Sequence, residues 1–551
     1  MLFLIKLLLV LIPLTLVGLY TISRLVGKSR LENLPVIPLL IVSFCIGLEI
    51  TALTYYYSIS LFHSYLPFAF LLLLALYLLK KDIAFVSIRF CNQNFASSFF
   101  FFAITALIIF FIHLKIGIGH VESHMVIADA IKYGNLPVMN TAELGTIGID
   151  KLELDNETSL FTIHESIYFP LNFFPLEEPL RPFHYKHPSI LSVFRLLSLD
   201  MAYPLLQLFE LVIFKLSIIS MIFLFINYET GKALLGFAGA SIYIFSGSWL
   251  MLSNLSEWLF IMNNVSPTEY SSSYRLAFGN AISFGYPTTL IQNPDIIIDF
   301  MTGTFFLFGF FYFLKKETST LTLLAPILLM VFFMKNGTGF GYISSALILS
   351  LMLTYHKLIK ENTSQYKLVF LTGILLLAVS SITFKWTLDF YNVYFTDNLK
   401  LLQKETLYFV KWESETFPLG QIGSWIKLFL QTGNILIFMP LVIFLAKDRS
   451  VSFLNHSLFI GGIFLADITV GFLFLGFNWP DWNMTRFWTF SFHYWNIAIA
   501  ISWSIWIMKT RFNRAVKIIV SAPLAVSIII QFIFIFGLTK YASYIHLVNA
   551  F

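Results

Sequence analysis

Residues 201–226 read MAYPLLQLFELVIFKLSIISMIFLFI. Apart from Glu210 and Lys215, the stretch carries no charged side chain. As an α-helix it would be about 39 Å long, which exceeds the roughly 30 Å hydrocarbon core of a bilayer. An apolar segment of this length predicts a membrane-spanning helix. The two ionisable residues inside it are candidates for function, because charges at membrane depth are costly.

Residues of the same character fill most of the 551-residue chain. Hydrophobic residues make up 58% of it and charged residues 12%, about half the roughly 25% of soluble domains. We therefore predict an all-α, polytopic membrane protein, because backbone groups in a bilayer must bond internally and the alternating strands of a barrel do not occur. The net charge of +5 is spread along the chain, so no nucleic acid partner is indicated. Two cysteines argue against a disulfide framework.

The requirement of about 20 apolar residues for each span predicts about fourteen transmembrane helices. They cover residues 1–21, 35–59, 64–80, 95–114, 201–226, 233–252, 298–314, 319–334, 338–355, 367–386, 425–446, 453–476, 487–508 and 517–538. The first segment lacks the basic region and the small-residue cleavage site of a signal peptide, so we expect it to be a retained helix.

Lys and Arg side chains predict the orientation of these helices. Basic clusters occur near residues 24–30, 80–89, 315–316, 357–367, 447–449 and 509–517, all on one side of the predicted membrane. The positive-inside rule makes that side cytoplasmic and puts both termini outside.

We treat residues 1–551 as a single integral membrane domain, with N-terminal helices at 1–114 and the remaining helices at 201–551. The extracytoplasmic side then carries the polar segments 115–200, 253–297, 387–424 and 477–486, where we expect the functional site.

The segment 118–140 reads IGHVESHMVIADAIKYGNLPVMN and follows the fourth predicted span. His124, Ala128 and Ile131 recur at helical spacing, which predicts an interfacial helix lying on the membrane. Gly134 and Pro137 are the expected signals for its end. Glu122 would lie near the start of this helix, at the mouth of the membrane, and Asp129 is expected to be structural.

This stretch resembles the first extracytoplasmic loop of GT-C glycosyltransferases, polytopic enzymes that use polyprenyl-phosphate sugars. The matching residues are Glu122, His124, Ala128, Ile131, Gly134 and Pro137. A second resemblance lies in FHYKHPSILSVFRLLS, residues 183–198, where Tyr185, His187 and Pro188 lead into the next span. The resemblance implies a polyprenyl-phosphate sugar donor, a glycan, lipid or protein acceptor, and a site in contact with membrane lipids.

Sugar transfer from a lipid phosphate needs a base for the acceptor hydroxyl and positive charge for the phosphate that leaves. Glu122 is the candidate base, and His124 would orient the acid or the acceptor. Candidate contacts for the donor phosphate or the substrate are Arg486, Arg275, Lys335, His184, Tyr185, Lys186 and His187. A structural role in an interfacial aromatic belt remains the alternative for Arg486 and for residues 184–187. The sequence makes no cofactor certain. Some GT-C enzymes use a divalent cation, so Mg²⁺ or Mn²⁺ stays open, and His120 with His124 could chelate a metal together with Glu or water.

Other functions stay open at this point. A polymerase or ligase of lipid-linked oligosaccharides would have the same layout, but it would depend more on Arg and His than on an acid. An ion-coupled transporter or flippase would use the ionisable residues at membrane depth, which are Glu49, Glu210, Lys215 and Asp467. A membrane scaffold without chemistry is the remaining alternative.

Overall fold

The computed structural model describes the chain in separate ranges. They are residues 2–26, 34–62, 95–116, 186–196, 203–247, 294–314, 411–412, 415–416, 433–435, 481–509 and 512–541, with single positions 64, 66, 69, 73, 77, 128, 131, 249, 289, 291, 437 and 438. The helices are α1 (Leu2–Val26), α3 (Val36–Phe62), α5 (Phe95–Ile116), α8 (Lys186–Leu196), α9 (Tyr203–Thr230), α10 (Ala233–Phe245), α13 (Pro294–Leu314), α21 (Asp481–Lys509) and α22 (Arg514–Tyr541).

The predicted all-α class holds for most of the described chain. Its strands are β1 (Lys411–Trp412) and β2 (Glu415–Thr416), a two-residue antiparallel pair. Four helices are long and apolar enough to cross a membrane, over Val36–Ile59, Phe95–Leu114, Leu205–Thr230 and Arg514–Ile533. Shorter apolar helices cover Leu11–Leu25, Ala233–Phe245 and Ile296–Phe306. These are the features of a helical membrane protein.

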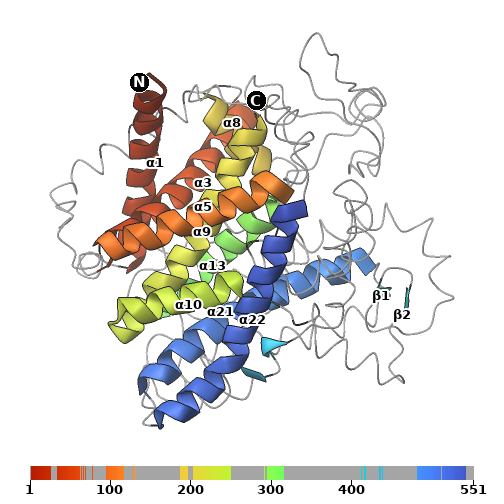
Figure 1. The fold of residues 1–551 in the computed structure, drawn as a ribbon. Coiled ribbons are helices and arrows are strands. Elements are labelled where there is room, and N and C mark those ends of the chain that lie inside the picture. The colour runs from red at the N-terminus through yellow and green to blue at the C-terminus, as the bar shows by residue number, and fades with distance from the viewer. Residues whose placement is uncertain are drawn as a thin grey trace, which may run out of the picture.

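Helix α9 lies in the middle of the described helices, together with α13 (Figure 1). It packs against α3, α5, α8, α10, α13 and α21. Most of its apolar span is therefore covered by protein. A helix that is apolar on every face needs such a position, or lipid, to keep its side chains out of water.

Helices α5 and α22 expose apolar faces instead. Exposed side chains on α5 include Phe100, Leu107 and Phe111. On α22 they include Ile519 and Ile529. Apolar side chains exposed along two helices would be unfavourable in water, whereas the hydrocarbon of a bilayer would cover them. The two exposed faces are thus consistent with a membrane protein.

Two predicted boundaries are wrong. The span expected at 233–252 ends as α10 at Phe245, because Ser246 takes an extended backbone and the Ser527 hydroxyl bonds to the N–H and the carbonyl of Gly247. The loop expected at 477–486 is helical from Asp481 onward. An acidic first residue suits a helix N-terminus, where the macrodipole is positive.

Helices α1 and α3 approach each other closely at two glycines. A Cβ atom on residue 18 would lie 1.7 Å from the carbonyl oxygen of Ser43. A Cβ atom on residue 47 would lie 1.8 Å from the carbonyl oxygen of Leu14. Small residues at such crossings let two membrane helices pack backbone to backbone. Gly18 and Gly47 thus set the distance between α1 and α3.

The substitution Gly47→Leu is expected to destabilise the protein in detergent by about 1–3 kcal/mol, since overpacking forces two backbones apart. Thermal unfolding of the purified protein measures the effect. Ala525→Leu adds similar bulk on the exposed side of α22 and is the matched control. Equal unfolding temperatures for the two variants would contradict the close approach of α1 to α3.

Candidate functional site

Ionisable side chains lie inside the helical bundle, at the depth of the apolar spans. Glu49 on α3 and Glu210 and Lys215 on α9 are each fully buried. Asp299 on α13 is 1% exposed. Burying a charge is costly unless it is paired or hydrogen-bonded, so the contacts of these groups define the candidate site.

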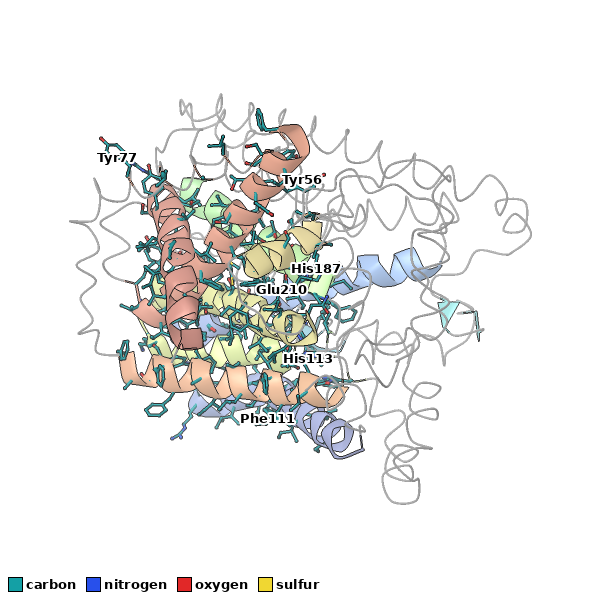
Figure 2. The ribbon with its side chains drawn as sticks, turned by 90° about the horizontal axis from the view of Figure 1, so that it is seen from above. Tyr56, Tyr77, Phe111, His113, His187 and Glu210 are labelled. Atoms are coloured by element: carbon teal, nitrogen blue, oxygen red, sulfur yellow. The ribbon has the colours of Figure 1, made fainter. Side chains whose placement is uncertain are left out.

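The first contact joins α8 to α9. His187 Nε2 lies 2.5 Å from Glu210 Oε2, and both side chains are buried. Figure 2 shows the two residues next to each other between these helices. His187 follows Lys186, the first residue of α8, and Pro188 occupies the first turn, where proline is tolerated. The pair therefore fastens the N-terminal turn of α8 to the middle of the bundle.

The second contact is centred on Lys215. Its Nζ lies 2.6 Å from His113 Nε2, 2.9 Å from the carbonyl oxygen of Thr289 and 2.8 Å from that of Ile291. His113 Nε2 also lies 2.9 Å from the carbonyl oxygen of Thr289, which can only accept a hydrogen bond. If Nε2 carries the imidazole proton, it donates to Thr289; if it accepts from Lys215, the proton lies on Nδ1. Lys215 thus joins α5 and α9 to the backbone that precedes α13, through groups that carry no negative charge.

The third contact joins α3 to α13. The Thr302 hydroxyl lies 2.6 Å from Glu49 Oε1 and 2.8 Å from the carbonyl oxygen of Ile298, one turn earlier on α13. Asp299, on the same turn, is close enough for its charge to act on Glu49. This part of the interior therefore holds two carboxyl groups and a hydroxyl.

The fourth contact joins α10, α13 and α21 around His493. Tyr243 Oη lies 2.7 Å from His493 Nδ1, and Thr304 Oγ1 lies 3.1 Å from Nε2. The ring of Phe300 stacks on the imidazole, with centroids 3.8 Å apart. Both ring nitrogens are thus satisfied, and the imidazole is held in one orientation.

These four contacts occupy related positions in the helices. Three of the helices, α9, α13 and α21, contribute residues from their N-terminal halves, and α5 and α10 contribute residues near their C-terminal ends. Polar contacts between helices that are not consecutive in sequence are characteristic of functional interiors in membrane bundles. The arrangement can hold a proton, orient α8 and resist a change in helix packing.

Few of the predicted site residues lie in the described chain. His187 is buried against Glu210, Lys186 begins α8, and Arg486 lies in α21 rather than in a loop. The residues outside the described chain are Glu122, His124, His184, Tyr185, Arg275, Lys335 and Asp467. Ala128 and Ile131, from the predicted interfacial helix, are helical and fully buried.

Sequence reasoning missed His113, Tyr243 and His493. Two of them are histidines inside predicted spans, and the rule that selected Glu210 and Lys215 would also have selected them. Thr302 had no comparable signal, because a threonine in an apolar helix usually bonds to its own backbone.

The predicted divalent cation has no site among the described residues: no group of three or more His, Cys, Asp and Glu side chains there is arranged to hold a metal ion. His120 and His124 lie outside that part of the chain. The fold and the buried contacts define a helical membrane protein with a polar interior. The chain matches no protein-family model, no curated protein and no solved structure.

Proposed function

We propose that the chain is an integral membrane glycosyltransferase of the GT-C type, which transfers a sugar from a polyprenyl-phosphate donor to an extracytoplasmic glycan, lipid or protein. One observation carries the proposal: the GT-C-like stretch from Glu122 to Pro137 follows soon after α5, which ends at Ile116. Ala128 and Ile131 belong to that stretch, and their full burial supports a helix that is anchored on the bundle.

The topology proposed with this function has about fourteen spans, with the basic loops in the cytoplasm and the long polar segments outside. The four candidate spans and the exposed apolar faces of α5 and α22 support a multi-pass arrangement. In this topology α5 ends, and α9, α13 and α21 begin, on the outer side. The four buried contacts then lie toward that side.

The anchoring of α8 supports a substrate-binding role for the segment before it. The bond between His187 and Glu210 holds the first turn of α8 against α9, so the position of Lys186 at the start of α8 is defined. Tyr185 and His184 precede that point directly in the sequence. An aromatic ring and two cations suit a sugar and a phosphate.

The remaining roles follow from the chemistry of the transfer. Glu122 takes the proton of the acceptor hydroxyl, and His124 orients it. Arg486, Arg275 and Lys335 bind the donor phosphate, and Mg²⁺ or Mn²⁺ would assist if a metal takes part. Arg486 lies in the first turns of α21, so its backbone is part of a regular helix.

An assay on the purified full chain in liposomes tests the proposal. We expect sugar transfer from a panel of polyprenyl-monophosphate sugars, measured as released polyprenyl phosphate. Release of polyprenyl diphosphate from diphosphate-linked oligosaccharides would instead favour a polymerase or ligase. Movement of the intact donor between leaflets without bond cleavage would favour a flippase. Either of those results, without transfer from a monophosphate donor, would contradict the proposal.

A further inference from the structure

Glu49 is a buried acid that the proposed sugar transfer does not use. It lies near the middle of α3, and its side chain is fully buried. Its Oε2 atom has no hydrogen-bond partner among the described residues. Titratable side chains are described on its own helix and on the helices around it. They are Cys45, Tyr55, Tyr56 and Tyr57 on α3, Tyr20 and Arg24 on α1, His113 on α5, His187 on α8, Glu210, Lys215, Tyr228 and Glu229 on α9, Asp299 on α13, Tyr243 on α10, and His493 and Tyr494 on α21.

The basic groups in this set contact other groups. Lys215 Nζ lies within hydrogen-bonding distance of His113, Thr289 and Ile291. Arg24 is exposed and donates to the Tyr20 hydroxyl. His187 bonds to Glu210. Asp299 is a second acid on the turn of α13 that precedes Thr302. An ionised Glu49 would thus be a buried carboxylate near a second acid, with no cation in contact among the described residues, and such a charge is strongly unfavourable.

The hydrogen bonds of Thr302 fit a protonated Glu49. A hydroxyl has one proton, yet Thr302 Oγ1 lies within bonding distance of two oxygens, one on Glu49 and one on Ile298. If Thr302 donates to the Ile298 carbonyl, the carboxyl group of Glu49 must supply the proton of the 2.6 Å contact. If Glu49 loses its proton, rotation of the hydroxyl lets Thr302 donate to Glu49 instead. The same heavy-atom positions therefore accept both protonation states.

A second titratable pair lies next to this site. Cys45, one turn before Glu49 on α3, approaches the carbonyl oxygen of Ile213 at 3.5 Å. The ring of Phe44, next to Cys45 in sequence, packs against that of Phe209, next to Glu210, with centroids 6.4 Å apart. The turn of α3 that precedes Glu49 therefore packs on the turn of α9 that carries Glu210, and Glu210 is bonded to His187 on α8.

We propose that Glu49 is a proton-binding site inside the helical bundle, with Thr302 as its reversible hydrogen-bond partner, and that the His187–Glu210 pair exchanges this proton with the α8 side. The ligand is a proton, and no bond other than O–H and N–H is formed or broken. Such a site makes the contact between α3 and α13 sensitive to protonation, and it does not depend on the transferase activity.

Infrared spectroscopy of the full chain in lipid nanodiscs tests this site. We expect a carboxylic-acid C=O band that shifts in D₂O and in protein labelled with ¹³C at the glutamate carboxyl group. Glu49→Gln should remove the band, because the amide keeps the shape of the protonated acid but not its O–H group. Thr302→Val should shift the band, because it removes the hydroxyl partner and leaves Glu49 in place. Glu210→Gln should keep the band and slow its exchange in D₂O severalfold.

Glu229→Gln is the matched control, because Glu229 is a half-exposed acid at the C-terminal end of the same helix as Glu210. It should change neither the band nor its exchange rate.

If Glu49→Gln fails to fold, the shift of the acid band in labelled Thr302→Val protein tests the same site. The site is overturned if folded Glu49→Gln keeps the whole acid band, or if Thr302→Val leaves the band unshifted. An unchanged exchange rate in Glu210→Gln would remove the His187–Glu210 pair from the proton path.

Discussion

Glu122→Gln is expected to abolish sugar transfer while leaving folding and donor binding largely intact. Gln has the size and hydrogen-bonding capacity of Glu, but it cannot accept the proton that the acceptor hydroxyl loses as it attacks the sugar. Loss of a general base typically reduces the rate by about 10²–10⁴-fold. Release of polyprenyl phosphate under single-turnover conditions measures the chemical step, and titration with the donor measures its binding separately.

Asp129→Asn is the matched control for this variant. Asp129 lies in the same segment and has the same charge, and we expect it to be structural. Its substitution should leave the rate of transfer near that of the wild type. Near wild-type transfer by Glu122→Gln would instead exclude Glu122 as the base. A parallel loss of donor binding would point to a role in the ground state rather than in proton transfer.

His187→Leu is expected to lower the free energy of unfolding by about 3–5 kcal/mol, because it removes the imidazole that bonds to the buried Glu210 carboxyl group. The side chains of His187 and Glu210 are 1% and 0% exposed, so water cannot replace the lost contact. Unfolding in mixed detergent micelles, followed by helix content, measures the difference. The loss of the pair would also free the N-terminal turn of α8 from the bundle.

The double variant His187→Leu with Glu210→Leu is the informative comparison. Replacing both members of a buried pair with apolar groups is often close to neutral, so the double variant should regain most of the stability. Glu229→Leu, a half-exposed position on α9, controls for the loss of a negative charge. If His187→Leu unfolds at the same denaturant concentration as the wild type, the contact between His187 and Glu210 contributes nothing to stability.

The helices were predictable because their signal is local. An apolar run long enough to cross a bilayer can be recognised without knowledge of its neighbours, and α3, α5, α9 and α22 lie where such runs were expected. The end of α10 was not predictable, because it depends on the hydroxyl of Ser527, 280 residues away from Gly247. The helical start of α21 at Asp481 was missed because Trp, Asn and Asp in that stretch resemble a polar loop.

By itself, the sequence determined that this protein is built from apolar helices and that a few ionisable side chains lie at membrane depth. Only the tertiary structure decided which of them meet. Glu49 bonds to Thr302, 253 residues away, and Lys215 bonds to His113, 102 residues away. Hydrophobicity causes a helix to enter the bilayer, but lipid is as apolar as leucine, so hydrophobicity does not select which helix faces meet. Close packing and buried hydrogen bonds between helices make that selection.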